Sequence, residues 1–442
     1  MVPLFYYRMD LKKIIIVLAV ILVVLAVAAY FIIRTFYGGL GPVKLEYWGL
    51  WEPEGVYQGV IDDYHRLHPN VTINYKRYSS IQYRERLSAD LVAGKAPDIF
   101  RYHNTWVPML MPYLSAVPPS AYTQANFRQV FYPVATESLL VKNQLWGIPL
   151  EVDTLLLFVN NGIFSQAGVT PPVYWTGEFE DTARRLTVRA GDRIERAGVA
   201  LGNAGNITHW QDILGLMLVQ NEVELPVLTS ERTSDVLKYY TGFESLDRVW
   251  DQTQDESKLA FARGKLAMYF GYHWDYFDIT EMSKGTNLSF KVVPVPQLVD
   301  GNVNYASFWV EGVAKNSKHQ KEAWGFIKFL SEPKQLTRMY EEAGKLRGFG
   351  EPYPRVDMAS LMADHPVLSV VAKQAPTAKS WYLASLTWDG QSGINSRIGT
   401  YFGDAVNAVA RSGEAKSALS TANLGVAQVL SEYGLVPPPV TK

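Results

Sequence analysis

Two aspartates in an aromatic-rich segment could support hydrolytic chemistry. Asp275 and Asp278 follow directly after His273 and Trp274. Glycosidases place two carboxylates on either side of a glycosidic bond, where one acts as an acid and the other as a base or nucleophile. The sequence does not fix the distance between these carboxylates, and one such pair is expected by chance in 442 residues. A cell-surface carbohydrate-active enzyme is therefore one of three hypotheses for this chain.

Other reactive chemistries have weaker support. Asp251, Asp255 and Glu256 could hold calcium, but their spacing is not that of an EF-hand loop, and a solvated acidic patch is the simpler interpretation. No phosphate-binding loop, zinc-protease motif or serine-hydrolase elbow occurs. The lack of cysteine excludes thiol catalysis, disulfides and a lipid-modified cysteine. We therefore predict no catalytic residue, no cofactor and no metal, with calcium left open.

Tryptophans beside polar residues are the more informative pattern. The chain contains 12 Trp, 26 Tyr and 19 Phe. Rings next to turn residues and carboxylates suit a ligand that has apolar faces and hydrogen-bonding edges, as sugars have. Packing in the core is the alternative for each ring taken singly. The tryptophans in such surroundings are Trp48, Trp51, Trp106, Trp210, Trp274, Trp309 and Trp388.

The elements that must position these residues begin with a β-α-β-α-β pattern. Alternating apolar residues predict strands over 43–47, 71–75 and 97–100, and helical spacing predicts helices over 60–67 and 83–93. This order is typical of a parallel sheet with right-handed crossovers. Ligands bind beyond the carboxyl ends of such strands. Two of those ends are rich in aromatic and polar residues, namely 48–54 and 101–106.

A second α/β unit follows. Residues 155–159 form a continuous apolar run that predicts a buried strand. Glu151 and Asp153 precede it, where an extended segment would pass between two lobes. The later elements predicted from periodicity are helices at 209–220, 234–250 and 321–330, strands at 265–270, 290–293 and 305–314, and two helices within 400–430.

An uncharged run of twenty residues, 14–33, predicts a transmembrane helix near the start of the chain. Arg8, Lys12 and Lys13 precede it, so the positive-inside rule predicts a cytoplasmic N-terminus and an extracytoplasmic body in a single-pass protein of the cell membrane. Cleavage of a signal peptide after Ala28 is the alternative. The net charge of -1 and the absence of basic runs indicate no nucleic-acid partner.

Four segments, in order, carry a resemblance to a known family. They read LSADLVAGKAPDI at 87–99, QLWGIPLEVDTLLLFVN at 144–160, FARGKLAMYFGYHW at 261–274 and VAKNSKHQKEAWGFIKFL at 313–330. Together they resemble the extracellular solute-binding proteins of ABC importers, in particular the carbohydrate-binding family 1, which includes maltose-binding protein. Two features depart from the family: residues 172–179 read PVYWTGEF, and the cysteine that usually carries the lipid anchor is missing.

The resemblance implies an α/β protein with a two-lobed, type II periplasmic-binding-protein-like fold and a ligand cleft, here preceded by one transmembrane helix. The implied organisation is a cytoplasmic stub, anchor and linker in 1–42, a first lobe of 44–150 plus 310–352, and a second lobe of 155–305 plus 357–442. Hinges are expected near 150–155, 305–310 and 351–356.

The implied function is the capture of a carbohydrate, in particular an oligosaccharide, and its delivery to ABC permease subunits by a monomer without enzymatic activity. A binding module of a surface sensor or adhesin is the second hypothesis, and polyols and peptides are alternative ligands. The residues implied to bind the ligand are Trp51, Glu52, His103, Asn104, Glu151, Asp153, Trp210, Tyr272, Trp274, Ser307, Trp309, Trp388 and Asp389.

Overall fold

The first lobe is built on a six-stranded sheet in the order β2–β1–β3–β15–β4, with β7 also paired to β15. β1 is parallel to β2 and to β3, which confirms the predicted parallel β-α-β-α-β unit, whereas β15 arrives much later in the chain and runs antiparallel to β3. The strands are β1 (Val43–Gly49), β2 (Val71–Arg77), β3 (Ile99–His103), β4 (Leu114–Ser115), β7 (Ile148–Pro149) and β15 (Trp309–Ala314).

The helices of this lobe bury one apolar face each. In α2 (Glu54–Leu67) the buried residues Val56, Val60 and Tyr64 recur at helical spacing. α3 (Tyr83–Val92) is followed by Gly94, whose φ of +67° favours glycine in the turn that leads to β3. The other helices here are α4 (Val107–Leu110), α5 (Gln124–Val130), α6 (Pro133–Leu139), α13 (Gln320–Leu330) and α14 (Pro333–Arg347).

The second lobe has a five-stranded sheet in the order β10–β11–β12–β9–β13. Its central strand β9 (Leu156–Asn160) is buried at every position and runs antiparallel to β12 (Leu266–Gly271) and β13 (Phe290–Val293). The hairpin of β10 (Val188–Ala190) and β11 (Arg193–Val199) was not predicted from the sequence. The helices are α7 (Asn161–Ala167), α8 (Glu180–Leu186), α9 (Trp210–Gln220), α10 (Glu231–Ser245), α11 (Ser257–Ala262), α12 (Asp275–Met282), α16 (Ile394–Ser412) and α17 (Ala415–Glu432).

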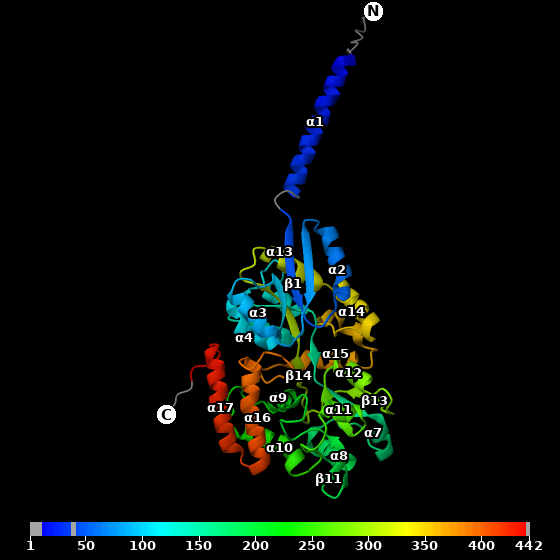
Figure 1. The fold of residues 1–442 in the computed structure, drawn as a ribbon, viewed down its shortest axis with the longest axis vertical. Helices are drawn as coiled ribbons and strands as arrows, with labels where there is room; N and C mark the ends of the chain where they lie inside the picture. Colours follow the sequence, from blue (N-terminus) through cyan, green and yellow to red (C-terminus); the bar gives the residue numbers. More distant parts are fainter. Residues whose placement is uncertain (1–10, 37–40, 439–442) are drawn as a thin grey trace, which may run out of the picture.

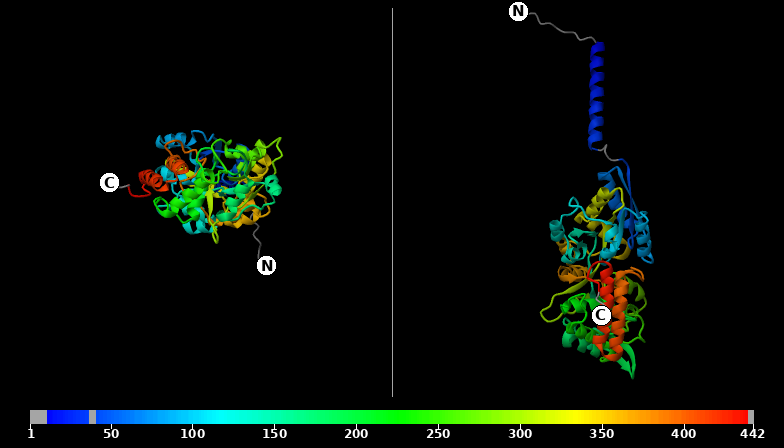
Figure 2. Two further views of the ribbon diagram at one scale, coloured as in Figure 1. Left: turned by 90° about the horizontal axis from the view of Figure 1, so that it is seen from below. Right: turned by 90° about the vertical axis from the view of Figure 1, so that its left-hand side faces the viewer.

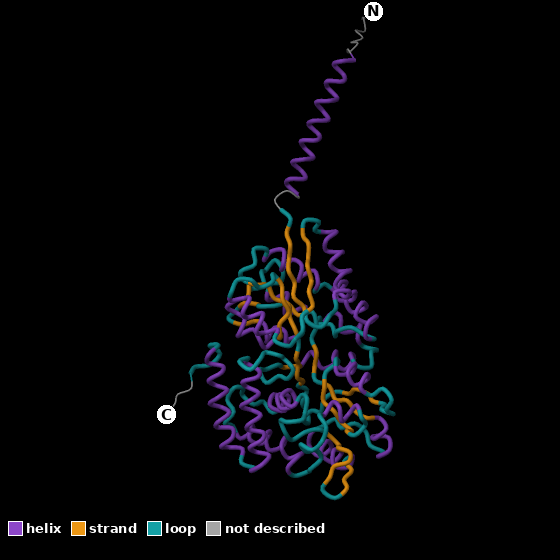
Figure 3. Tube along the Cα trace, in the orientation of Figure 1, coloured by secondary structure: helices purple, strands orange, loops and turns teal. Residues whose placement is uncertain are grey.

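A small sheet lies between the two lobes (Figure 1, Figure 3). It pairs β14 (Asn304–Ser307) with β8 (Asp153–Thr154) and with β16 (Ala378–Lys379). The single strand predicted over 305–314 is therefore two strands, because the chain turns at Phe308 from this small sheet into β15 of the first lobe. β8 and β14 fall within two predicted hinge segments, while the predicted lobe limits stay a prediction.

The remaining elements connect these units. They are α15 (Leu368–Gln374), the β5 (Leu140–Val141) and β6 (Gln144–Leu145) pair, the π-helical segment Trp175–Phe179, and the 3-10 turns Asn104–Trp106, Met111–Tyr113, Val356–Met362 and Ala375–Thr377. In two views at right angles, helices flank the sheet of each lobe, and α16 and α17 lie side by side on the second lobe (Figure 2).

The computed structural model describes residues 11–36 and 41–438. It contains a helix α1 (Leu11–Phe36) that points away from the two lobes (Figure 1, Figure 2). Counted over the part of the chain that the structure describes, no helix is long and apolar enough to cross a membrane. Some side chains of the predicted span 14–33 lie outside the described residues. Residues 1–10 of the predicted stub and residues 37–40 of the predicted linker also lie outside them.

Candidate ligand-binding site

A cavity of about 330 Å³ lies where the two lobes meet the small middle sheet, and we call it the hinge cavity. Both lobes and the connecting segments contribute to its wall. Its volume falls in the range of small-molecule sites. Its lining residues are Trp51, Glu151, His273, Trp274, Phe277, Asp278, Ser307, Trp309, Arg347, Glu351, Ser385, Leu386 and Trp388.

Three tryptophan rings from separate segments form one side of the hinge cavity. The centroid of the Trp51 ring lies 5.6 Å from that of Trp309 and 5.0 Å from that of Trp388. Trp309 rests on the fully buried ring of Trp106 at 5.3 Å. Edge-to-face and tilted contacts of this kind stabilise ring pairs and hold their orientation. The faces left free therefore form an apolar surface of fixed shape.

A fourth tryptophan is placed by the second lobe. Trp274 stacks on Tyr272 with a centroid distance of 4.4 Å and an interplanar angle of 15°. Tyr272 is itself held from below, since its hydroxyl donates to Asp212 at 2.8 Å. Trp274 immediately precedes α12, and Phe277 of the same helix also lines the cavity. The rings of both lobes thus line one cavity.

Charged groups from both lobes meet on the floor of the hinge cavity. Arg347, at the end of α14, donates to Glu52 at 3.0 Å and to Glu351 at 2.6 Å. Glu351 also lies 2.8 Å from Nε2 of His273 in the second lobe. The other ring nitrogen of His273 bonds Asp153 of β8. This network of Glu52, Asp153, His273, Arg347 and Glu351 links both lobes to two connecting segments, and we call it the hinge network.

The electrostatics of the floor follow from burial and from the crowding of carboxylates. Burial, together with the negative charge of Glu351, raises the pKa of Glu52 to about 7. The same two causes raise the pKa of Glu151 well above its usual value. Burial alone would lower the pKa of His273, but Asp153 and Glu351 outweigh it and raise that pKa to about 10. His273 is therefore a cation at neutral pH.

The loop 385–389 closes another part of the wall. The backbone N–H of Ser385 donates to Asp212 at 3.0 Å, and its hydroxyl bonds His209. Leu386 and Trp388 have φ values of +50° and +48°, a region that residues with a side chain rarely adopt. Asp389 accepts the N–H of Asn395 at 2.6 Å at the start of α16. The loop is thus fixed at both ends while Trp388 remains 37% exposed.

The structure brings together part of the predicted site and puts the rest beneath or beside it. The predicted residues that line the hinge cavity are Trp51, Glu151, Trp274, Ser307, Trp309 and Trp388. The predicted residues outside its lining are Glu52, His103, Asn104, Asp153, Trp210, Tyr272 and Asp389. Direct contact of any of them with a ligand stays a prediction.

Several of the predicted residues outside the lining hold others in place. His103 is fully buried, and its Nε2 lies 2.9 Å from the hydroxyl of Ser307 in the wall. Burial lowers the pKa of His103 to about 3, so its ring is neutral. Asn104 donates to Ser380 at 2.9 Å and ties the end of β3 to the segment after β16. These side chains position the wall of the cavity from behind.

Sequence reasoning missed several lining residues: His273, Phe277, Asp278, Arg347, Glu351, Ser385 and Leu386. Of these residues, only Asp278 belonged to the hypothesis of hydrolysis, and Glu351 only marked a hinge segment. The sequence signal for His273 was its place directly before Trp274 in the segment 261–274. Nothing in the local sequence of Arg347 distinguishes it from the exposed cations along α14.

The aspartate pair considered for hydrolysis does not flank the hinge cavity. Asp275 is fully buried and bonds His209 at 2.8 Å, Lys258 at 3.1 Å and the N–H of Tyr272 at 2.9 Å. Asp278 lies at the rim and shares Lys258 at 2.7 Å. A pair that acts on a glycosidic bond must face it from both sides, and Asp275 is not in the cavity wall.

The acidic group considered for calcium is engaged in local contacts. Asp251 accepts the N–H of Thr253 at 2.8 Å, Asp255 pairs with Arg263 at 2.7 Å, and Glu256 caps the start of α11. Across the described residues, no group of three or more histidines or carboxylates is arranged to hold a metal ion.

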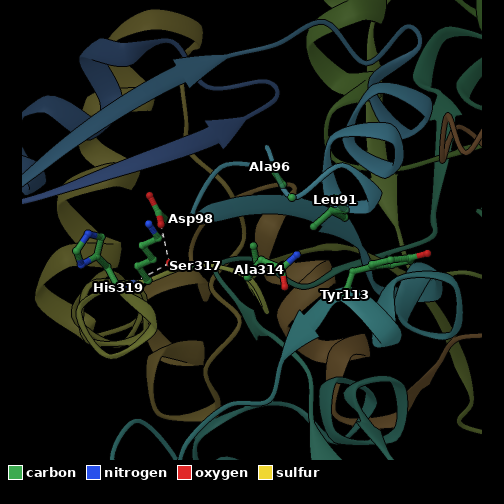
Figure 4. Close-up of a pocket in the computed structure, with 10 residues that line it drawn as sticks. Leu91, Ala96, Asp98, Tyr113, Ala314, Ser317 and His319 are labelled. Atoms are coloured by element: carbon green, nitrogen blue, oxygen red, sulfur yellow. Dashed lines mark hydrogen bonds between the residues drawn. The ribbon is translucent and has the colours of Figure 1, made fainter.

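Two of the other hollows lie in the first lobe and beside the hinge cavity. One of about 190 Å³ lies in the first lobe at the opposite end of β3 from His103 (Figure 4). Its Asp98 accepts from Ser317 and from the N–H of Glu46, so this carboxylate connects the sheet to the loop before α13. The other, an outer groove of about 460 Å³ between α9 and α16, shares Leu386 and Trp388 with the hinge cavity and includes Trp210.

The fold and this cavity define a class of protein that binds a solute between two lobes, and comparison with known proteins agrees. The family model described as "Bacterial extracellular solute-binding protein" matches residues 51–337. The chain belongs to this family, whose members bind solutes and are not enzymes. The predicted resemblance to the solute-binding proteins of ABC importers is thereby confirmed.

Individual relatives are distant in sequence. The maltotriose-binding protein of Pyrococcus abyssi is 21% identical over 315 residues, which are 69% of this chain and 66% of that protein. The chain thus spans about two thirds of the length of that curated relative. The sugar-binding protein MalE of Xanthomonas citri is 19% identical with a TM-score of 0.71, covering 88% of this chain and 98% of its own.

A third similar structure is a cyclo/maltodextrin-binding protein in complex with maltotetraose. It is 16% identical with a TM-score of 0.70, and the match covers 90% of this chain and 99% of the other. At such identities the likeness shows the two-lobed fold.

Proposed function

We propose that the hinge cavity captures a carbohydrate by closure of the two lobes. The single observation that carries this proposal is that tryptophan faces and hydrogen-bonding groups from both lobes line one cavity: Trp51 and Arg347 from the first, Trp274 and Asp278 from the second. Rings cover the apolar faces of a sugar, and charged groups bond its hydroxyls. A ligand that contacts both lobes favours the closed state, because only differential affinity shifts such an equilibrium.

We further propose that the ligand is an oligosaccharide. The outer groove adjoins the hinge cavity through Leu386 and Trp388, so a chain of sugars bound in the cavity could continue past the Trp388 ring. The groove offers Trp210 as a second ring, and its Gln211 has a buried side-chain oxygen without a hydrogen-bond partner among the described residues. The relatives whose names mention maltotriose and maltotetraose agree with this size of ligand.

A thermal-shift screen tests this function. Glucose, maltose, maltotriose and maltotetraose would be compared with other mono- and oligosaccharides, polyols and peptides. We expect an oligosaccharide to raise the melting temperature, because a ligand at 100 times its Kd stabilises the native state by about 2.7 kcal/mol. A response to peptides or polyols alone would contradict the proposal.

Replacing Trp274 by alanine should weaken the binding of the responding sugar about tenfold or more, since the loss of a stacked ring costs on the order of 1.4 kcal/mol. Isothermal titration calorimetry would measure the change. Tyr174→Ala serves as the control, because Tyr174 is an exposed aromatic residue outside the cavity. Equal affinities of the two variants would show that the ligand binds elsewhere.

We also propose the limits of the lobes, the partner that receives the ligand, and the attachment to the membrane. The lobes would comprise 44–150 plus 310–352 and 155–305 plus 357–442, and a monomer would deliver its ligand to ABC permease subunits. Residues 14–33 would anchor the body outside the cell membrane. The uncharged sequence of that run and the exposure of its side chains between Ile15 and Val27 support an anchor. A lipid environment would cover those side chains.

The anchor can be tested on the expressed protein. We expect the full chain to stay in the membrane fraction after high-salt and carbonate washes and to require detergent for release. A chain that starts at residue 41 should be soluble. Mass spectrometry of the mature protein provides the decisive outcome, because a chain that begins at Ala29 would mean that the helix is removed.

A further inference from the structure

The floor of the hinge cavity holds more carboxylates than cations. Glu52, Asp153 and Glu351 belong to the hinge network, and Glu151 lies beside them. Within the described residues, the cations bonded to this group are Arg347 and His273. Arg101 also acts electrostatically on Glu151 and Glu52, but its ion pair is with a further buried carboxylate, Glu311, at 2.7 Å. With Arg101 and Glu311 included, five carboxylates share three cations.

Glu151 is the carboxylate without a cation of its own. It is 5% exposed and lines the hinge cavity. Among the described residues, no N–H group or cationic side chain bonds its carboxylate oxygens, and burial together with the negative charge of Glu351 raises its pKa. A buried carboxylate in this position must either keep a proton or receive a positive charge from outside the protein.

The remaining wall also suits a positive charge. The rings of Trp51, Trp274, Trp309 and Trp388 surround the same space, and the face of an aromatic ring attracts a cation. One such contact already exists at the edge of the cavity, where the guanidinium of Arg347 lies 5.2 Å from the centre of the Phe277 ring. A neutral sugar would use these faces but would leave the excess of carboxylates unchanged.

We propose that the preferred ligand carries a protonated amine beside its hydroxyl groups, as an amino sugar does, and that Glu151 is the carboxylate that receives this amine. The inference rests on the proposed function, since it concerns the same cavity. In the empty protein Glu151 holds a proton and donates it to Glu351; when the ammonium group enters, that proton leaves for solvent and an ion pair forms in its place.

The experiment compares neutral and amino sugars of the same skeleton at pH 6, where the amine is charged. The probes are glucose, galactose and mannose, each with its 2-amino and 2-acetamido derivative, and the corresponding disaccharides. Calorimetry in two buffers of different ionisation enthalpy gives both the affinity and the number of protons released. We expect a 2-amino sugar to bind at least tenfold more tightly than its neutral parent, because charged hydrogen bonds are stronger than neutral ones. We also expect the release of about one proton, which is the proton that Glu151 gives up.

Glu151→Gln has the same shape and cannot take up the charge. It should abolish the preference for the amine and the proton release, so that an amino sugar and its neutral parent bind the variant with similar affinity. Glu54→Gln, at an exposed position near the start of α2, should behave as the wild type. Equal binding of neutral and amino sugars, or a preference that survives in Glu151→Gln, would overturn the inference and leave the proposed function standing. Failure of every sugar, charged or neutral, would overturn the proposed function itself.

Discussion

Replacing His273 by glutamine is expected to lower the free energy of unfolding of the body by roughly 3–5 kcal/mol at pH 8, the cost of breaking a buried charge pair from one side. His273 is 1% exposed and lies between Asp153 and Glu351. Its removal leaves two carboxylates without the cation that joins them. The loss should be no smaller at pH 5, because the contribution of His273 to stability is complete below its usual pKa of 6.5 and declines as the pH rises toward about 10. Denaturant titration at both pH values measures the effect.

The matched control for this prediction is His68→Gln. His68 is an exposed histidine after the end of α2, and its replacement should change stability by no more than about 0.5 kcal/mol. A loss for His273→Gln that is no larger than this would show that the hinge network does not stabilise the fold. The same variant should also weaken ligand binding, since Glu351 and Asp153 would no longer be held at the cavity.

The stability of the wild-type protein is expected to fall as the pH rises from about 5.5 to 8.5. The folded-state pKa of Glu52 is about 7, above its usual value of 4.5, so the folded protein holds a proton that the unfolded chain has lost. This contribution is complete below pH 4.5 and disappears as the pH passes 7. The difference between these two pKa values corresponds to roughly 3 kcal/mol in the free energy of unfolding. Glu151, whose pKa is also raised, acts in the same direction.

His273 extends this slope to higher pH. Its folded-state pKa of about 10 exceeds the usual 6.5, so its contribution is lost between those values as the pH rises. Asp275 limits stability at acid pH. His209 is the main group that lowers the pKa of Asp275, from 3.8 to about 2, despite its burial. The contribution of Asp275 to stability is therefore lost as the pH falls through that range. The contributions of these three groups therefore place the maximum of stability between pH 3.8 and 4.5.

Melting temperatures measured across this pH range provide the test. Glu52→Gln should flatten the fall between pH 4.5 and 7, whereas Glu54→Gln, two residues away and exposed, should keep the wild-type profile. If the wild-type melting temperature rose over this range, the carboxyls of the floor would not hold their protons in the folded protein.

The sequence predicted the regular elements well because their periodicity depends on near neighbours. The β-α-β-α-β unit, the buried strand β9 and the paired C-terminal helices were all predicted, and β13 matches residue for residue. The hairpin β10–β11 was missed because its strands are largely exposed and carry little apolar alternation. The break between β14 and β15 was missed because both strands are buried throughout, so no change in pattern marks the turn at Phe308.

The site was harder to predict because side-chain direction depends on turns. Trp51 and Glu52 are consecutive, yet Trp51 lines the hinge cavity while Glu52 faces Arg347 beneath it. A strand end can be located from the sequence, but which of two adjacent residues points to the ligand depends on the path of the next few peptides. The resemblance to the family indicated which residues lie near the ligand cleft, but not which of their side chains point into it.

Long-range pairing explains the other missed residues. Arg347 and Glu351 matter because Glu52 pairs with Arg347 and His273 pairs with Glu351, each from a distant part of the chain. No local pattern distinguishes such a cation from a solvated one. The loop 385–389 is similar, since the positive φ values at Leu386 and Trp388 occur at residues that normally avoid them.

The loop 385–389 sets the stability of the fold against the affinity for the ligand. A left-handed backbone at residues with a Cβ costs on the order of 1–2 kcal/mol each, so Leu386 and Trp388 weaken the resting fold. The bonds from Ser385 to Asp212 and from Asn395 to Asp389 hold the loop in this form. A glycine at 388 would relax the chain and remove the ring at once. Selection for thermal stability would therefore favour glycine at position 388, whereas selection for tight ligand binding would favour tryptophan.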